Sequence, residues 1–270
     1  MKILVDARMY GLEHGGIGRY VENLINNLLE IDTVNSYLLV MRSEAQSLKL
    51  KTENRGLKVK TIVADIPHYS LREQVELPRL FKSLEFDIAH FPHFNVPLSF
   101  NRPFVVTIQD LIKHASRGVK TTTKSPLLYW LKYAGYKKVF AHAVGSSKKI
   151  IAPSNSVKDD LLMNYDIIPD KIVVVYEGVD DVFKFEARNS ELETVIRKYK
   201  IQKPYVIYTG SVYPHKNIER LIQAIKKLEL NLVIAGSRNV FMGRIENFTR
   251  KYGAEKFVSF LGFVPDEELA

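Results

Sequence analysis

The chain has 270 residues, of which 46% are hydrophobic and 26% are charged, and this balance predicts a soluble globular protein of about two domains. It contains no cysteine, which excludes disulfides and thiolate metal sites and fits a reducing, cytoplasmic setting. Neither a signal-peptide pattern nor an apolar run near the roughly 20 residues that span a bilayer occurs, so we do not expect an integral membrane protein.

Short apolar runs typical of buried strands alternate with helical patterns over the first part of the chain. The predicted strands cover residues 3–5, 37–41, 59–63, 87–91, 104–108, 150–152 and 172–175. The predicted helices cover residues 17–31, 71–84, 127–141 and 155–163. Pro78 is expected to kink or interrupt its helix, and Ser154 to cap the last one. This alternation predicts a parallel sheet with helices on both faces, whose ligands bind outside the carboxyl ends of the strands.

A glycine-rich stretch at residues 15–20, Gly-Gly-Ile-Gly-Arg-Tyr, lies between the first predicted strand and the first predicted helix. Because side chains are missing there, backbone N–H groups and the helix dipole can face an anion such as a sugar phosphate or nucleotide phosphate. The stretch is not the dinucleotide fingerprint, because Val21 stands at the third glycine position. No Gly-Lys-Ser/Thr occurs, which excludes a Walker loop. The simpler alternative is a tight turn that needs a positive φ.

The formal net charge of +9 is placed unevenly along the chain. Residues 111–158 contain no acidic residue and ten basic ones: Lys113, Arg117, Lys120, Lys124, Lys132, Lys137, Lys138, Lys148, Lys149 and Lys158. This excess favours an anionic partner, with lipid head groups, nucleic acid and a phosphorylated substrate as alternatives. An aromatic stripe at helical spacing runs through the same segment: Tyr129, Tyr133, Tyr136 and Phe140. The stripe is typical of core packing, whereas Trp130 and the lysines would also suit a membrane interface.

A second series of strands and helices follows a polar segment at residues 177–203. We therefore expect a first domain at residues 1–185, a linker at 186–203 and a second domain at 204–270. The predicted strands of the second domain cover residues 205–208, 232–235 and 257–261. Its predicted helices cover residues 218–228 and 244–251, and one more begins at Pro265. Asn217 is expected to cap the first of these helices.

Six short motifs carry a family resemblance when they are taken in chain order. They are residues 15–20, 106–111 (Val-Thr-Ile-Gln-Asp-Leu), 151–156 (Ile-Ala-Pro-Ser-Asn-Ser), 176–180 (Tyr-Glu-Gly-Val-Asp), 208–217 (Tyr-Thr-Gly-Ser-Val-Tyr-Pro-His-Lys-Asn) and 260–269 (Phe-Leu-Gly-Phe-Val-Pro-Asp-Glu-Glu-Leu). Together they resemble the retaining, nucleotide-sugar-dependent glycosyltransferases of family four. The resemblance implies an α/β fold of GT-B type, with a complete Rossmann-like acceptor domain followed by a truncated Rossmann-like donor domain.

Donor binding is implied by the resemblance for seven residues: Gly16, Gly210, Ser211, His215, Lys216, Phe263 and Val264. Transfer from a nucleotide sugar leaves a diphosphate, so the enzyme must stabilise its developing negative charge. The sequence has no Asp-x-Asp that would hold a metal, and the metal-free solution is a cation with helix dipoles and backbone N–H groups. Lys216 is suited to that role, and its alternative is an ordinary solvated lysine. By resemblance, Gly16 approaches the same phosphates, and the backbone at 263–264 lines the base pocket.

Acceptor binding is expected from four residues at strand ends: Gly15, His93, Gln109 and Asp110. His93 can face the acceptor or serve as a structural histidine in an aromatic loop. Gln109 cannot act as an acid or base, but it can donate a hydrogen bond to sugar hydroxyls. Asp110 can bind in the same way or cap the turn that follows it. No metal ligands are expected.

The sequence departs from the family pattern at several points. Gln109 stands where the family usually has a histidine, and His215 where it usually has an arginine. Family members also continue past residue 270 with a Glu-x7-Glu pair and a terminal helix that returns to the first domain. We therefore expect a truncated and inactive chain, and its catalytic residues stay unassigned.

These observations predict a glycosyltransferase that moves a sugar from a UDP- or GDP-linked donor to a glycan or lipid-linked acceptor. The expected acceptor belongs to a cell-envelope polysaccharide or lipopolysaccharide, and the reaction is retaining, metal-independent and without a cofactor. We expect a cytoplasmic location, with peripheral contact to an anionic inner membrane face as an option. One alternative is a nucleotide-sugar 2-epimerase of GT-B architecture. Another is a basic binding module, although no recognised nucleic-acid motif supports nucleic acid as a partner.

Overall fold

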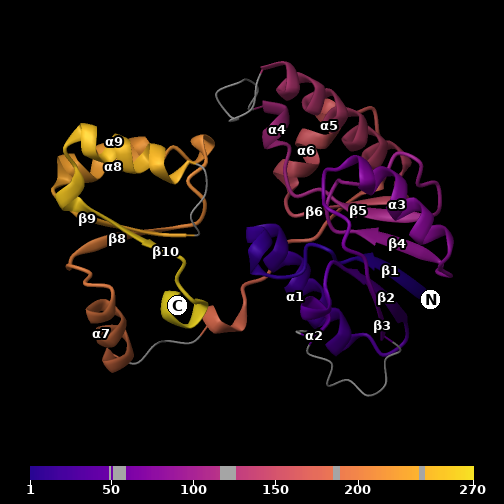
Figure 1. The fold of residues 1–270 in the computed structure, drawn as a ribbon, viewed down its shortest axis with the longest axis horizontal. Coiled ribbons are helices and arrows are strands. Elements are labelled where there is room, and N and C mark those ends of the chain that lie inside the picture. Colours follow the sequence, from indigo (N-terminus) through magenta and orange to yellow (C-terminus); the bar gives the residue numbers. More distant parts are fainter. Residues whose placement is uncertain (49, 51–58, 116–125, 185–188, 237–240) are drawn as a thin grey trace. The chain divides into compact units, whose positions relative to one another are not determined.

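The computed structural model describes the chain except for residues 49, 51–58, 116–125, 185–188 and 237–240 (Figure 1). The chain forms two compact units, Met1–Glu177 and Gly178–Ala270. The first unit thus ends before the expected limit at residue 185. Helix α7 (Asn189–Lys198), which lies within the expected linker, belongs to the second unit. One reason is that Lys198 Nζ and Tyr199 Oη donate to the Glu268 carboxylate of that unit, at 2.5 and 2.6 Å.

The first unit contains a seven-stranded sheet in the order β3-β2-β1-β4-β5-β6-β7 (Figure 1). Its strands are β1 (Lys2–Asp6), β2 (Ser36–Met41), β3 (Val59–Val63), β4 (Ile88–Phe91), β5 (Phe104–Thr107), β6 (Lys149–Ala152) and β7 (Ile172–Val174). Every pairing between them is parallel. The chain adds strands on one side of β1 and then on the other, so the topology switches between β1 and β4. Open parallel sheets bind ligands at the carboxyl edge beside such a switch.

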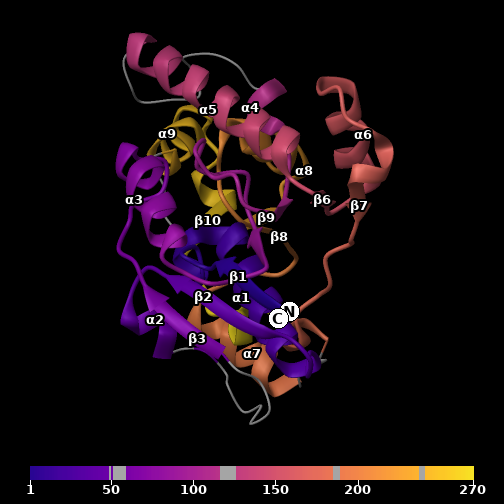
Figure 2. The same cartoon turned by 90° about the vertical axis from the view of Figure 1, so that its right-hand side faces the viewer.

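Helices cover both faces of this sheet, as the alternation of elements predicts. They are α1 (Gly15–Ile31), α2 (Glu44–Leu48), α3 (Leu71–Lys82), α4 (Ile112–Ala115), α5 (Pro126–Ser146) and α6 (Asn155–Asn164). Successive strand residues point to opposite faces, so Leu4 and Val5 belong to two different clusters. Val5 packs in the cluster of α1, and Leu4 in the cluster that contains residues of α3 and α5. Helix α6 packs along β6 and β7 (Figure 2).

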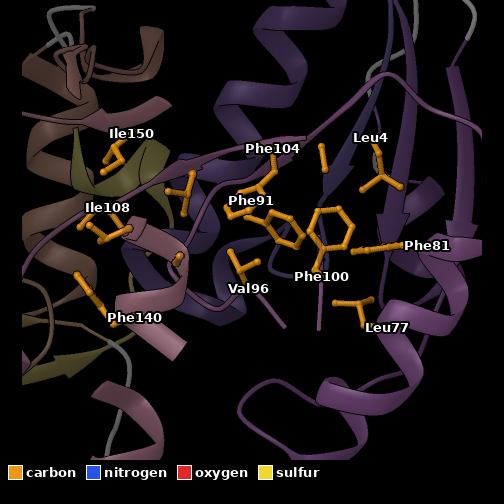
Figure 3. Packing of buried hydrophobic residues seen from close by; sticks show 14 of the residues in the cluster. Leu4, Leu77, Phe81, Phe91, Val96, Phe100, Phe104, Ile108, Phe140 and Ile150 are labelled. Carbon is orange, nitrogen blue, oxygen red and sulfur yellow. The ribbon is translucent and has the colours of Figure 1, made fainter. Parts of the chain in front are cut away.

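Phenylalanines dominate the core between β4, β5 and α3 (Figure 3). The rings of Phe91, Phe100 and Phe104 meet edge to face, with centroids 5.2 to 5.7 Å apart. Phe81 of α3 joins them from the helix side at 5.6 Å from Phe100. Such pairs stabilise a core beyond the area that they bury.

The second unit has a three-stranded parallel sheet in the order β10-β9-β8. Its strands are β8 (Tyr205–Thr209), β9 (Asn231–Ala235) and β10 (Val258–Gly262). Helices α8 (Ile218–Leu228) and α9 (Met242–Tyr252) lie on one side of this sheet, and α7 lies on the other (Figure 1). The core lies under α8 and α9, where Ile222 is completely buried. A short helix, α10 (Asp266–Leu269), ends the chain as described.

The predicted parallel α/β architecture is confirmed, and three predicted details of its helices can be compared with the structure. Helix α3 runs through Pro78, so of the two predicted effects, a kink or an interruption, the interruption is wrong. Ser154 Oγ accepts from the Val157 N–H at 3.2 Å, which confirms the predicted cap. Asn217 precedes α8 but has a left-handed backbone with φ 55° and makes no side-chain capping bond, so the predicted cap is wrong. A capping side chain needs the extended backbone that Ser154 has.

The aromatic stripe on α5 is buried at its far end, where Tyr136 and Phe140 belong to the core. Trp130, near the start of α5, is 50% exposed. Of the basic residues in this region, Arg117, Lys120 and Lys124 lie outside the described residues. None of the described helices is long and apolar enough to span a bilayer.

Candidate functional site

The glycine-rich stretch forms the start of α1, at the carboxyl edge of the large sheet. Gly15 is the first residue of the helix and has φ +64°, so the positive-φ turn is present. A Cβ atom on Gly15 or Gly16 would meet no other atom within 4 Å. A Cβ on Gly18 would lie 1.9 Å from the carbonyl oxygen of Gly11. Gly18 therefore serves close packing, whereas Gly15 and Gly16 leave the helix N-terminus open to a ligand.

His93 follows β4 and lies among aromatic rings, as expected for a structural histidine in an aromatic loop. Its ring centroid is 4.1 Å from that of Phe94, and its Nε2 is 3.3 Å from the Tyr69 hydroxyl. Its Nδ1 is buried and has no hydrogen-bond partner within the described part of the chain. Burial, helped by the nearby His68 and Lys113, lowers the pKa of His93 to about 3. His93 is therefore neutral at pH 7 and keeps one nitrogen available.

Gln109 and Asp110 follow β5 and have different environments. Gln109 Nε2 is buried and has no hydrogen-bond partner among the described residues, so it can donate to a ligand. Asp110 is exposed, and its Oδ1 accepts from the Ile112 N–H at 2.9 Å. Of the two predicted roles of Asp110, the structure therefore shows the capping of the turn that follows it.

A buried polar chain links α1 to β4 and β5, and the sequence reasoning did not identify it. The Tyr20 hydroxyl lies 3.2 Å from Thr107 Oγ1, which lies 2.9 Å from His90 Nε2. Burial lowers the pKa of His90 to about 4, so this imidazole is neutral. The last residue of the glycine-rich stretch is thus tied to the two strand ends that carry His93 and Gln109.

A charged cluster lies buried behind the same edge and was also missed. Arg8, which is 0% exposed, donates to Asp6 at 2.7 and 2.8 Å and to Glu73 Oε1 at 2.6 Å. Burial by itself would raise the pKa of Asp6, but the charge and hydrogen bonds of Arg8 outweigh it and hold that pKa below its usual value. Burial opposes the charge of Arg8 as well, and its two carboxylate partners raise its pKa despite that. Asp6 and Arg8 are therefore held in their charged forms, and Glu73 completes the hydrogen-bonded cluster.

Glu73 connects this cluster to the turn before α3. Its other oxygen, Oε2, accepts from the Tyr69 N–H at 2.8 Å and from Asn95 Nδ2. Tyr69 has a left-handed backbone with φ 58°, which is unusual for an aromatic residue. The sequence held a signal for this arrangement, because Ser70-x-x-Glu73 has the capping-box spacing, and Ser70 Oγ does accept from the Glu73 N–H at 3.1 Å.

The predicted donor residues of the second unit gather where its three strands end. The Gly210 N–H donates to the Ala235 carbonyl at 2.9 Å, and the Gly236 N–H donates to the Gly262 carbonyl at 2.8 Å. A Cβ on Gly236 would lie 2.2 Å from the Gly210 oxygen. The three glycines therefore let the strand ends approach closely and keep side chains away from the edge.

Lys216 lies beyond this edge, in the 3-10 turn Pro214–Lys216 that leads into α8. It is exposed, and no carboxylate of the described residues forms an ion pair with it. His215 stacks on Tyr213, with ring centroids 5.9 Å apart and planes 10° apart. A cation at this position, next to a helix N-terminus, can attract a diphosphate.

Three further residues are predicted to bind the donor, namely Ser211, Phe263 and Val264. The Ser211 carbonyl accepts from the Tyr208 hydroxyl at 2.7 Å, which fixes the loop after β8. Phe263 is 58% exposed directly after β10, whereas Val264 is 7% exposed. The six predicted donor residues of this unit therefore share one sheet edge and the turn beside it. Gly16 belongs to the other unit, and its part in donor binding stays a prediction.

Two family models match the chain in sequence. The model described as Glycosyltransferase Family 4 matches residues 14–183, and the model described as Glycosyl transferases group 1 matches residues 192–270. The O-antigen chain mannosyltransferase B of Escherichia coli is 26% identical over 193 residues, which are 67% of this chain and 47% of that protein. The phosphatidylinositol N-acetylglucosaminyltransferase GPI3 subunit of Saccharomyces cerevisiae is 20% identical over 94% of this chain and 57% of its own length. The chain thus spans about half the length of these curated relatives.

Among solved structures, the Anabaena protein HepE in complex with UDP and glucose superposes with a TM-score of 0.68. The match covers 100% of this chain and 71% of HepE, at 17% sequence identity. This likeness is one of fold, and it confirms the expected α/β architecture of GT-B type.

Proposed function

This chain belongs to glycosyltransferase family 4, and from that we propose that it serves the transfer of a sugar from a nucleotide sugar to an acceptor. The inactivity of this chain by itself stays a prediction. The proposed acceptor is a glycan or a lipid-linked glycan of a cell-envelope polysaccharide or lipopolysaccharide. The names of its relatives support this class, since one acts on an O-antigen chain and the other is part of a phosphatidylinositol glycosyltransferase. We propose a retaining reaction that needs no metal.

One observation carries the donor half of this proposal: three glycine-ended strands meet beside an exposed lysine that no described carboxylate pairs with. The departing diphosphate carries negative charge that must be stabilised in the transition state. Lys216 would supply a positive charge, and the first N–H groups of α8 would supply hydrogen bonds and the helix dipole. These groups perform the task without a metal ion.

The nucleotide is proposed to be UDP or GDP. HepE, whose fold is similar, is known in complex with UDP, which makes UDP the first candidate to test. Phe263 is the exposed aromatic residue at the end of β10, and it would pack against the base. In the first unit, Gly15, His93 and Gln109 would face the acceptor, and Gly16 would contact the donor phosphates.

The donor site is tested by thermal unfolding of this chain with UDP, GDP or ADP and without added metal. A nucleotide that binds only the folded state at about 100 times its Kd stabilises it by about 2.7 kcal/mol. We expect one nucleotide to raise the Tm, and Lys216→Ala to remove most of that rise. Lys227→Ala is the matched control, because Lys227 is exposed at the other end of the same helix.

A rise in Tm that survives Lys216→Ala would contradict the role of Lys216. If none of the three nucleotides changes the Tm, the proposed donor site at this sheet edge is wrong.

A further inference from the structure

A small buried space lies at the carboxyl edge of the large sheet. It lies among residues that follow β1 and β4 and the turn before α3, including Asp6, His68, His93 and Asn95. It has room for a single water-sized group. The remaining lining residues, Met9, Val21, Phe91 and Pro92, are apolar, so the polar groups occupy one part of its wall.

Two nitrogen atoms of these side chains have no hydrogen-bond partner within the described residues, namely His68 Nε2 and His93 Nδ1. Both atoms are buried, and buried polar atoms in folded proteins are nearly always paired. The neighbouring groups are already engaged, since both oxygens of Asp6 accept from Arg8 and Asn95 donates to Glu73. The two imidazole nitrogens are therefore the lining atoms that can still form a hydrogen bond with a ligand.

Glu73 lies near His68 and hydrogen-bonds the backbone of Tyr69, the residue that contacts His93. Its Oε1 lies 3.6 Å from His68 Nδ1, and its Oε2 accepts from the N–H of Tyr69. The Tyr69 hydroxyl in turn lies 3.3 Å from His93 Nε2. His93 is therefore hydrogen-bonded at Nε2 and leaves Nδ1 available, whereas His68 Nδ1 lies near Glu73 without a hydrogen bond and its Nε2 is available.

The local charge disfavours an anion in this space. Asp6 is the acidic residue among those that line the space, and its carboxylate, which Arg8 holds charged, would repel an added phosphate, whereas Lys113 acts on His93 from nearby. His93 is neutral, since burial lowers its pKa to about 3. A neutral imidazole offers one donor and one acceptor nitrogen, and a hydroxyl group can act as both donor and acceptor.

We propose that this space is a hydroxyl subsite in which His68 Nε2 and His93 Nδ1 bind one hydroxyl group of an uncharged acceptor sugar. This inference rests on the proposed sugar transfer and defines the chemistry of its acceptor. The rest of the sugar lies outside the space. An open hollow lies nearby that His14 lines, and the His14 ring meets that of His68 edge-on at 5.6 Å.

The test is a titration of the whole chain, followed by NMR of its histidine side-chain nitrogens. The probes are the methyl α-glycosides of glucose, mannose and galactose, and glucose 6-phosphate as the anionic counterpart. We expect at least one neutral glycoside to shift the His68 and His93 resonances with a Kd on the order of millimolar. We expect glucose 6-phosphate to bind more weakly than methyl glucoside.

His68→Phe and His93→Phe keep an aromatic ring and remove its nitrogens, so each should abolish the shift at the remaining histidine. His142→Phe is the matched control: His142 Nε2 is also buried without a partner in the described residues, but this residue belongs to α5 and does not line the space. The wild-type titration is informative even where a variant fails to fold.

Three results would overturn the inference: no neutral glycoside moves either resonance, glucose 6-phosphate binds more tightly, or a bound water stays in place at saturating glycoside. The nucleotide-dependent Tm is measured on the same samples. If nucleotide binds and the glycosides do not, only the hydroxyl subsite is wrong. If glycosides bind and nucleotides do not, the donor site is the part that is wrong.

Discussion

Arg8 and Glu73 form a completely buried ion pair in which each side chain is 0% exposed. Arg8 also donates from Nη1 to the Ile66 carbonyl at 2.9 Å, so each of its three guanidinium nitrogens forms a hydrogen bond. Transfer of such charges from water is costly, and a buried pair persists only where extra hydrogen bonds satisfy both partners. The pair fastens the start of α3 to the end of β1, and with it the turn that carries His68 and Tyr69.

We predict that Glu73→Gln lowers the free energy of unfolding by on the order of 3 kcal/mol, because it leaves part of the buried charge of Arg8 uncompensated. Urea denaturation measures this change. Glu76→Gln is the control on the same helix: Glu76 pairs with Arg72 on the surface, and exposed pairs of this spacing contribute only about 0.5 kcal/mol. Equal losses for the two variants would contradict a special role for Glu73.

At the scale of elements, the start of α1 depends on one close approach. The helix meets the preceding turn where Gly18 faces the Gly11 carbonyl oxygen, and no side chain fits between them. Gly11 has φ +111°, a backbone conformation that favours glycine. Packing and turn geometry therefore account for Gly11, Gly15, which has φ +64°, and Gly18, so Gly16 is the glycine of this stretch that is left for a ligand.

We predict that Gly18→Ala destabilises the chain by about 1–3 kcal/mol, because the added methyl group would overlap the Gly11 carbonyl and force the helix to move. Gly16→Ala meets open space within the first turn of the helix, and alanine is favoured there by about 0.5–1 kcal/mol. Thermal unfolding compares the two variants. If Gly16→Ala is the more damaging one, this view of the helix start is wrong.

At the scale of the whole molecule, the net charge of +9 is concentrated in the basic segment 111–158, and this segment also exposes apolar side chains. The first turns of α5 expose apolar side chains, with Leu127 73% and Leu131 64% exposed next to the half-exposed Trp130. The segment from 111 to 158 has no acidic residue to repel a negatively charged surface. Exposed Trp and Leu beside lysines are typical of proteins that lie on anionic membranes. We therefore propose that the start of α5 contacts an anionic membrane, the place where a lipid-linked acceptor would be held.

We predict that the chain sediments with vesicles containing phosphatidylserine or phosphatidylglycerol and not with vesicles of phosphatidylcholine alone. Added salt should weaken the binding, because screening shortens the reach of the lysines. The variant Trp130→Ser with Leu131→Ser should lose most of it. Met163→Ser is the control, since Met163 is 75% exposed on α6 and lies outside the segment. Equal binding to neutral and anionic vesicles would contradict the proposal.

The sequence by itself determined the parallel α/β architecture, the two series of strands and helices, and the family resemblance. These properties follow from local patterns: apolar runs specify buried strands, and glycines and helix caps such as Ser154 mark where strands and helices begin or end. The position of Lys216 before α8 was readable for the same reason.

The tertiary structure alone decided which polar groups are engaged and which remain available to a ligand. Arg8 meets Glu73 across 65 residues, and Tyr69 meets His93 across 24. It also decided that Asp110 caps a turn and that α7 belongs to the second unit through Glu268, which lies 70 residues beyond Lys198. Local sequence patterns do not specify such pairings, because the partners come together only when the sheets are assembled and the helices packed.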